Sequence, residues 1–250
     1  MRIIFIENRY KTRFWEYLAS WVEKEGHEVY WLIQNHAFSP KSKDNSLVIP
    51  YPSSRELSQI DEVNLPEKIE SSNRGLNYFG IRSPKFLHYY YSKIEEYILK
   101  VRPDLVFGEC TQFHEMIAIE ICKRIQTLFL HPSSCRYPQG RFSFYKYDTL
   151  VTFSGCGESP SDERFEAMLS DIGQGRAQPD YMKKNYEPHR SEVLEDKVRL
   201  TAQYFKGERF NTPHPLKKLK LDKQKKEMME QWDAIAESGV THEAPFRVLF

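Results

Sequence analysis

The sequence predicts an α/β protein: a Rossmann-like parallel sheet flanked by helices and followed by connecting helices. Three observations lead to this fold class. Apolar runs of strand length alternate with helical patterns from the first residues onward. The helical patterns are long enough to cross over between parallel strands, and such crossovers are right-handed. Polar, reactive side chains follow directly after several apolar runs, as at the ligand-binding edge of open α/β sheets.

The first strand–helix–strand unit occupies the beginning of the chain. Residues 2–6 form an apolar run that is typical of a buried parallel strand. Over residues 13–24 apolar side chains recur every three or four positions, which predicts an amphipathic helix, and Gly26 ends it. Residues 27–33 are the second predicted strand. The turn between the first strand and the helix lacks the G-x-G-x-x-G fingerprint, which argues against a dinucleotide bound there.

The remaining predicted elements continue this alternation. Residues 47–49 form a short strand that prolines end, and a helix covers residues 83–100, with Ser83 as its cap and Pro84 in its first turn. A helix is also predicted through residues 116–124. Further strands are predicted at residues 104–107, 127–130 and 149–153. Beyond them the predicted elements are helices, at residues 161–169, 192–205 and 216–236.

Four polar residues lie close behind the first predicted strand: Glu7, Asn8, Arg9 and Thr12. At the carboxyl end of a strand and the start of a helix, their side chains are suited to bind an acceptor hydroxyl or an anion. The alternative is a capped helix whose charges are solvated. The sequence leaves both interpretations open.

The fourth predicted strand is followed by a turn with several reactive groups. Glu109 comes after Gly108, which allows close approach of the backbone, and His114 and Glu115 lie in the first turn of the next helix. A strand-end carboxylate with a histidine nearby is suited to general acid–base chemistry, so Glu109 is a candidate catalytic residue and His114 a candidate ligand for substrate. For Glu115 we prefer a structural role, in which it compensates the helix dipole.

The fifth predicted strand ends at His131, a second candidate catalytic residue, although a hydrogen-bonded histidine at the edge of the core is an equal alternative. Ser133 adds a hydroxyl and a free amide. Arg136, Arg141 and Lys146 then alternate with aromatic residues over residues 136–147. Cations beside aromatic rings suit an anionic, ring-shaped ligand such as an acidic sugar or a nucleotide.

Composition excludes several classes of function. The net charge is +1, and no RNA-binding motif is present, so the sequence predicts no nucleic-acid partner. The 4 cysteines show no zinc-ligand spacing, so we expect no metal and reduced thiols in a cytoplasmic protein. The opening residues are too short for a signal sequence, and no apolar run reaches the ~20 residues of a membrane span.

The chain divides into three predicted parts. Residues 1–153 form the Rossmann-like domain, and residues 154–245 a helical connecting region. The lysine-rich first half of the helix at 216–236 either touches anionic lipid or is a solvated face, and we prefer the latter. Residues 246–250 have the character of a strand, and we expect them to begin a second α/β domain.

Several segments of the sequence indicate a protein family only when they are taken together. They are the opening unit with Gly26 and His27, the turn at residues 108–116, the strand end at residues 128–132, and residues 140–145 and 247–250. Together they resemble bacterial capsule polysaccharide biosynthesis proteins, including the Kdo transferases that build the lipid-linked primer of the capsule.

The resemblance implies a GT-B glycosyltransferase, in which two Rossmann-like domains face a cleft. This chain would contribute the N-terminal, acceptor-binding half. A nucleotide-sugar, for example CMP-Kdo, would be the donor, and no cofactor would be tightly bound. Glu109 would be a general base or nucleophile with His131 as its partner in the cleft, and Arg136 and Arg141 would hold an acidic sugar.

The implied partner is a glycan or glycolipid acceptor, which would bring the protein into peripheral contact with the inner-membrane surface. The competing hypothesis is a non-catalytic module that binds an anionic polysaccharide or a protein partner through its aromatic and basic segments.

Overall fold

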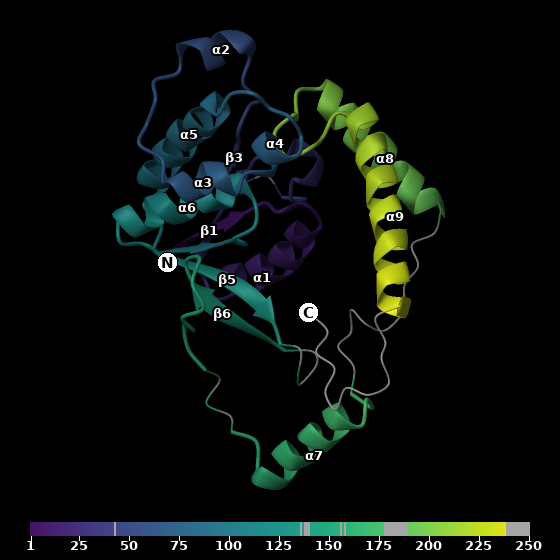
Figure 1. Cartoon of the computed structure of the whole chain (residues 1–250). Helices are drawn as coiled ribbons and strands as arrows, with labels where there is room; N and C mark the ends of the chain where they lie inside the picture. The colour runs from purple at the N-terminus through teal and green to yellow at the C-terminus, as the bar shows by residue number, and fades with distance from the viewer. Residues whose placement is uncertain are drawn as a thin grey trace.

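The computed structural model describes residues 1–238 apart from residues 43, 136, 138–140, 156, 158 and 178–189, and the side chains of residues 190–192 and 233–238 are also outside the description. Its centre is a six-stranded sheet in the order β3-β2-β1-β4-β5-β6 (Figure 1). The strands are β1 (Arg2–Ile6), β2 (Glu28–Ile33), β3 (Ser46–Val48), β4 (Leu105–Phe107), β5 (Leu128–Ser134) and β6 (Phe142–Lys146).

Five of the strands are parallel, and β6 alone pairs antiparallel to its neighbour β5. The order reverses between β1 and β4, because the chain builds outward from β1 to β3 and then returns to the other side of β1. In open sheets of this kind the crevice for ligands lies outside the carboxyl ends of the strands at the reversal. The predicted fold class, a mostly parallel sheet flanked by helices, is confirmed.

Helices cover both faces of the sheet, and each face has its own apolar core. The helix α1 packs on one face, where Trp15 and Ala19 meet Ile3 and Phe5 of β1. The helices α5 and α6 pack on the other face, against the alternate side chains of the same strands. The helices and 3-10 turns before residue 125 are η1 (Arg9–Lys11), α1 (Thr12–Lys24), η2 (His36–Phe38), α2 (Ser54–Gln59), α3 (Glu67–Ser71), α4 (Arg74–Asn77), α5 (Lys85–Val101) and α6 (Phe113–Arg124).

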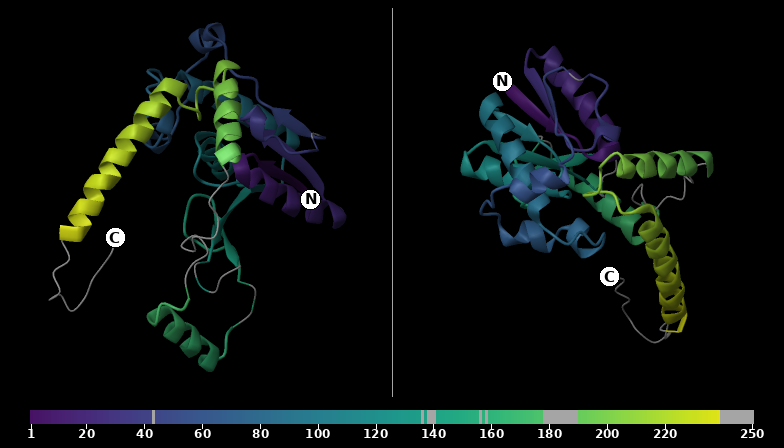
Figure 2. Two further views of the ribbon diagram at one scale, coloured as in Figure 1. Left: turned by 90° about the vertical axis from the view of Figure 1, so that its right-hand side faces the viewer. Right: turned by 90° about the horizontal axis from the view of Figure 1, so that it is seen from above.

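Three helices follow the sheet: α7 (Asp162–Gly173), α8 (Arg190–Phe205) and α9 (Pro215–Ser238). The helix α8 packs beside η1 and η2: the Tyr10 hydroxyl donates to Asp196 at 2.6 Å, and the Arg199 guanidinium lies 4.9 Å from the centre of the Phe38 ring. The helix α9 projects away from the sheet in both views of Figure 2. No helix in the described residues is both long and apolar enough to span a membrane.

The last strand of the sheet differs from the prediction. The sequence predicts a strand at residues 149–153, but the structure places β6 at Phe142–Lys146, where Phe144 packs 5.3 Å from Phe107 and joins the α1-side core. Leu150 is 87% exposed, and a single bridge between Tyr145 and Thr152 is what remains of the predicted pairing. The alternating aromatic side chains of β6 can reach the core, which explains why this segment forms the edge strand instead.

Two smaller predictions also need comment. Ser83 is not the cap of α5: Pro84 is the residue before the helix, in a helical conformation, and the helix begins at Lys85. The predicted strand at residues 246–250 lies outside the described residues.

Candidate functional site

Three fully buried carboxylates organise the carboxyl edge of the sheet: Glu7 after β1, Glu115 in α6, and Glu208 in the segment between α8 and α9. Buried charges are costly unless they are hydrogen-bonded. Each of these carboxylates accepts hydrogen bonds from two or three backbone N–H groups, so each one fixes the path of a loop.

Glu7 joins the turns after β1 and β2. One of its oxygens accepts the N–H of Arg9 at 2.7 Å, and the other accepts the N–H groups of Gln34 at 3.3 Å and Asn35 at 2.8 Å. Burial raises the pKa of Glu7, while these N–H groups and the nearby His114 ring act in the opposite direction. Arg9 has a positive φ of 43°, and its N–H bond to Glu7 helps to hold this unusual backbone conformation.

Glu115 has a structural role, as predicted, but it acts through hydrogen bonds to the loop before its helix and not only through the helix dipole. It accepts the N–H groups of Glu109 at 2.9 Å, Thr111 at 3.2 Å and Gln112 at 2.9 Å, and the side-chain amide of Asn8 at 2.8 Å. Burial raises the pKa of Glu115 to about 7, although the Asn8 amide and the backbone N–H groups favour its ionised form. These amides at the start of α6 are therefore already bound to an internal anion.

Glu208 brings a distant part of the chain to the same edge. Its carboxylate accepts the Gln34 amide at 2.6 Å and the N–H groups of Phe210 at 2.9 Å and Asn211 at 2.8 Å. Phe210 stacks on Phe86 of α5, with ring centres 4.7 Å apart, and Asn211 donates to Gln34 at 2.7 Å. Burial raises the pKa of Glu208. Residues 208–212 are thus docked into the crevice where the strand order reverses.

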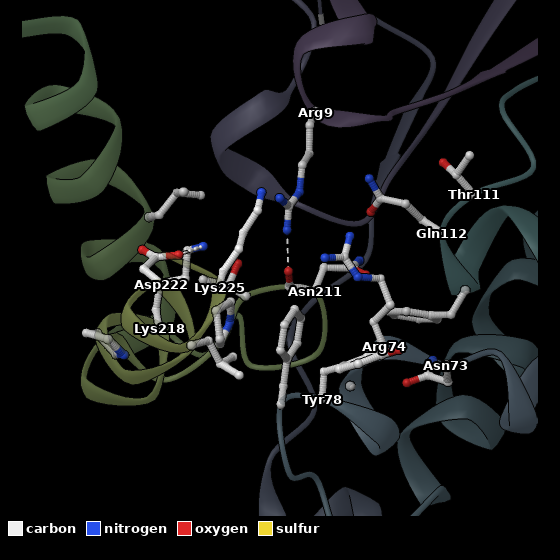
Figure 3. A pocket seen from close by; sticks show the side chains of 18 of the residues that line it. Arg9, Asn73, Arg74, Tyr78, Thr111, Gln112, Asn211, Lys218, Asp222 and Lys225 are labelled. Atoms are coloured by element: carbon white, nitrogen blue, oxygen red, sulfur yellow. Dashed lines mark hydrogen bonds and ion pairs between the residues drawn. The ribbon is translucent and has the colours of Figure 1, made fainter. Parts of the chain in front are cut away.

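A cavity of about 950 Å³ opens between this edge of the sheet and the helices α8 and α9 (Figure 3). Arg9, Arg74 and Lys225 are directed into it. Amide and hydroxyl side chains of Asn73 and Thr111 also line it. Its apolar wall contains Tyr78, Phe79, Leu219, Met228, Met229 and Trp232.

The predicted residues after β1 occupy different environments. Arg9 lines the cavity, and its guanidinium donates to the Asn211 carbonyl. Asn8 and Thr12 are buried, and the Thr12 hydroxyl accepts the Asn8 N–H at 3.2 Å. His114 is fully buried and donates from Nε2 to the Glu7 carbonyl oxygen at 2.8 Å. The structure therefore places Arg9 at the cavity and gives Asn8, Thr12 and His114 contacts within the loops beneath it.

Glu109 and His131 are not brought together as a pair. Glu109 forms an ion pair with Lys11 at 2.7 Å, on the side of the sheet that α1 covers. His131 shares its strand face with Phe129 in the opposite core; its ring donates from Nδ1 to the Tyr147 carbonyl at 2.5 Å and stacks on Tyr145. Phe107 is level with Leu130 in the β4–β5 register, so Glu109 and His131 are one position out of step, and successive positions along a strand face opposite sides of the sheet.

The remaining predicted ligands lie on the β5–β6 hairpin. Ser133 is exposed on β5, where it pairs with Ser143, and Lys146 ends β6. Arg141 is exposed just before β6, and its carbonyl oxygen accepts the Cys135 N–H at 2.9 Å. Arg136 lies outside the described residues. Ser133, Arg141 and Lys146 are not among the residues that line the cavity.

Sequence reasoning missed several residues at this edge. Gln34 and Asn35 follow β2 directly, so the rule that identified Glu7 and Glu109 would have found them. Arg74, Glu208 and Thr212 carry no such local signal, because long-range packing alone brings them to the sheet. Within the described residues no group of three or more histidine, cysteine, aspartate or glutamate side chains is placed to hold a metal ion.

Comparisons with known proteins add little to this description. No protein-family model matches the chain, and neither does any curated protein. Among solved structures, part of the chain is similar to the glycosyltransferase VinC in complex with dTDP, at 15% sequence identity and a TM-score of 0.31. The match covers 52% of this chain and 33% of that chain, and no argument about activity is based on it. The class that the fold and the site define is a Rossmann-like α/β domain with a cation-lined cavity at its carboxyl edge.

Proposed function

We propose that this chain is the acceptor-binding half of a glycosyltransferase that uses a nucleotide-sugar donor in the synthesis of a capsule or another surface polysaccharide. CMP-Kdo is the first donor to test. Residues 1–153 are the acceptor-side domain in this proposal, and residues 154–245 connect it to a second domain that begins near residue 246. The sequence resemblance to capsule biosynthesis proteins motivates the choice of donor.

The observation that supports the proposal best is the composition of the cavity. Side chains of Asn73, Thr111 and Gln112 offer hydrogen-bonding groups, while Tyr78 and Trp232 offer aromatic surface. Binding sites of this kind combine apolar walls with a few placed polar groups. A glycan or glycolipid acceptor presents both hydroxyl groups and apolar faces, and it therefore suits this lining.

Glu109 remains the candidate general base in this proposal. Glu109 is 5% exposed and forms an ion pair with Lys11, whose side chain is 57% exposed, so the ion pair lies next to solvent. The carboxylates of Glu7, Glu115 and Glu208 are fully buried and bound to backbone N–H groups, which suits a structural role. We propose His131 as a positioning residue only, because its ring is bound to a carbonyl group on the opposite face.

An assay of sugar transfer tests this function. The protein is expressed together with any residues that flank it in its natural reading frame. CMP-Kdo and a capsule-type glycolipid would be the first pair of substrates. We expect Glu109→Gln to lower kcat at least about 100-fold, the usual contribution of a general base. Glu95→Gln is the matched control, because Glu95 also pairs with a surface cation, Arg124, and should retain activity. Unchanged transfer by Glu109→Gln would remove Glu109 from the mechanism.

A binding module without catalysis is the second candidate, and one observation favours it. Asp222 is the acidic residue among the described residues that line the cavity, and it is paired with Lys218 at 2.5 Å. Within the described part of its lining, the cavity thus offers no free carboxylate for acid–base chemistry. Tight binding of an anionic oligosaccharide with no transfer of any tested nucleotide-sugar would support this candidate, whereas measured turnover would exclude it.

A further inference from the structure

The charge of the cavity lining is strongly unbalanced. Among the described residues that line it, five are basic, Arg9, Arg74, Lys197, Lys218 and Lys225, while one is acidic, Asp222. The only ion pair among these six residues is Lys218 with Asp222. Like charges around a partly enclosed space repel one another, and a bound anion would relieve that repulsion.

Arg9 is the most buried of these cations. Its guanidinium donates to the Asn211 carbonyl, but its Nε is buried without a hydrogen-bond partner. No carboxylate forms an ion pair with it among the described residues, because the nearby Glu7 and Glu208 are bound to backbone N–H groups instead. Burial lowers the pKa of Arg9, the charges of Glu208 and Glu7 raise it, and the charge of Arg74 lowers it. An unmatched donor in such a position is costly, and a ligand oxygen would satisfy it.

Arg74 is the second cation without an anionic partner. It begins α4, and its guanidinium lies 5.7 Å from the centre of the Phe79 ring. Its side chain makes no hydrogen bond or ion pair within the described residues. Figure 3 shows its guanidinium directed toward the same part of the cavity as that of Arg9. The aromatic contact orients the side chain and leaves its N–H groups available to a ligand.

Thr212 contributes a third unsatisfied group. Its side chain is part of the cavity lining, the residue is 3% exposed, and Oγ1 has no hydrogen-bond partner. Buried hydroxyl groups are nearly always hydrogen-bonded, so this hydroxyl lacks a partner at a residue that lines the cavity. Thr212 directly follows Asn211, the residue that Arg9 holds. Arg9, Arg74 and Thr212 all line this cavity.

We propose that Arg9, Arg74 and Thr212 bind a phosphoryl group. Two guanidinium groups and a hydroxyl offer more donors than a carboxylate can accept at once, whereas a phosphoryl group has enough oxygens and a charge near −2. The start of α6 is not the binding site, because Glu115 occupies its N–H groups. The inference rests on the proposed function only where it assigns the phosphoryl group to an acceptor or donor substrate.

Calorimetric titration tests the site without any turnover, so its failure is distinct from failure of sugar transfer. The probes are inorganic pyrophosphate, octyl phosphate and CMP. For at least one probe, we expect Arg74→Gln to weaken binding at least about 10-fold, and Thr212→Val by a smaller factor. Arg55→Gln is the matched control: Arg55 is also exposed near the start of a short helix but is not part of the cavity lining.

The probes also distinguish the source of the phosphoryl group. Loss of octyl phosphate binding in Arg74→Gln assigns the group to an amphiphilic acceptor, and loss of CMP binding assigns it to the nucleotide of the donor. Thr212→Val keeps the shape of the side chain, so it tests the site even if Arg74→Gln unfolds. Binding of all three probes to both variants as tightly as to the wild type would overturn the proposal, as would no binding to the wild type.

Discussion

Two sets of charged residues lie at the same edge of the sheet, and they differ in how they are satisfied. The carboxylates of Glu7, Glu115 and Glu208 are fully buried, and each accepts at least two backbone N–H groups. Arg9 and Arg74 face the cavity and form no ion pair within the described residues. The carboxylates hold loops in place, whereas both arginines have guanidinium N–H groups that are not bound to a carboxylate.

The difference shows which polar groups belong to the fold and which are free to bind. A buried carboxylate that is matched to amides contributes to loop geometry and leaves no capacity for a ligand. A buried guanidinium N–H without a partner, such as Nε of Arg9, costs free energy until something binds it. The comparison assigns the internal anions to structure and the cavity cations to recognition.

The largest expected effect is on the carboxylate side. Glu115→Ala would leave the N–H groups of Glu109 and Gln112 and the Asn8 amide buried without an acceptor, so we expect the free energy of unfolding to fall by about 4 kcal/mol. Urea denaturation followed by circular dichroism measures it. Glu166→Ala, at an exposed position in α7, should stay within about 0.5 kcal/mol of the wild type. A loss below about 1 kcal/mol for Glu115→Ala would contradict the structural role of the carboxylates.

A smaller effect concerns His114, which is buried against the Glu7 turn. Burial lowers the pKa of His114, and its Nδ1 has no hydrogen-bond partner, so the folded protein prefers the neutral ring. The unfolded chain binds a proton near pH 6.5, and stability is therefore present above that pH and lost as the pH falls toward the lower folded pKa. The groups that face the ring are Glu7, whose Oε2 lies 4.0 Å from Nε2, and Arg9.

This dependence is measured by urea denaturation at pH 7.5 and pH 5.5. Between these values we expect the wild type to lose about 1 kcal/mol more stability than His114→Gln, which keeps a donor for the Glu7 carbonyl but does not titrate. Because Glu7 is present in both proteins, its own titration largely cancels in the difference. Equal losses in the two proteins would show that His114 does not titrate as its burial requires.

The smallest expected effect is on the arginine side. Arg74 has no ion pair or hydrogen bond within the described residues, so Arg74→Gln should change the free energy of unfolding by less than about 0.5 kcal/mol, even though it weakens phosphate binding. Thermal denaturation in phosphate-free buffer measures this change. If Arg74→Gln lowered the free energy of unfolding by more than about 1 kcal/mol, Arg74 would be a structural residue. The arginines and the buried carboxylates would then not differ in role.

The predicted elements were found where local patterns are strong. The apolar run before Glu7, the helix ended by Gly26 and the structural role of Glu115 all depend on residues close together in the chain, and the structure confirms them. The edge strand was misplaced, because the choice between residues 142–146 and 149–153 depends on which aromatic side chains reach Phe107. Glu109 and His131 do not form the predicted pair either, because they are one position out of step in the register of β4 and β5, which directs their side chains to opposite faces.

The sequence by itself determined the alternation of strands and helices and the presence of polar side chains at strand ends, because hydrophobic periodicity and turn chemistry are local properties. Only the tertiary structure decided which of those side chains are hydrogen-bonded inside the protein and which face a cavity. Arg74 and Thr212 reach the cavity through contacts between segments more than a hundred residues apart, and no local pattern encodes such contacts. Burial then separates the roles, since a charge removed from water needs a partner and an unmatched one is left for a ligand.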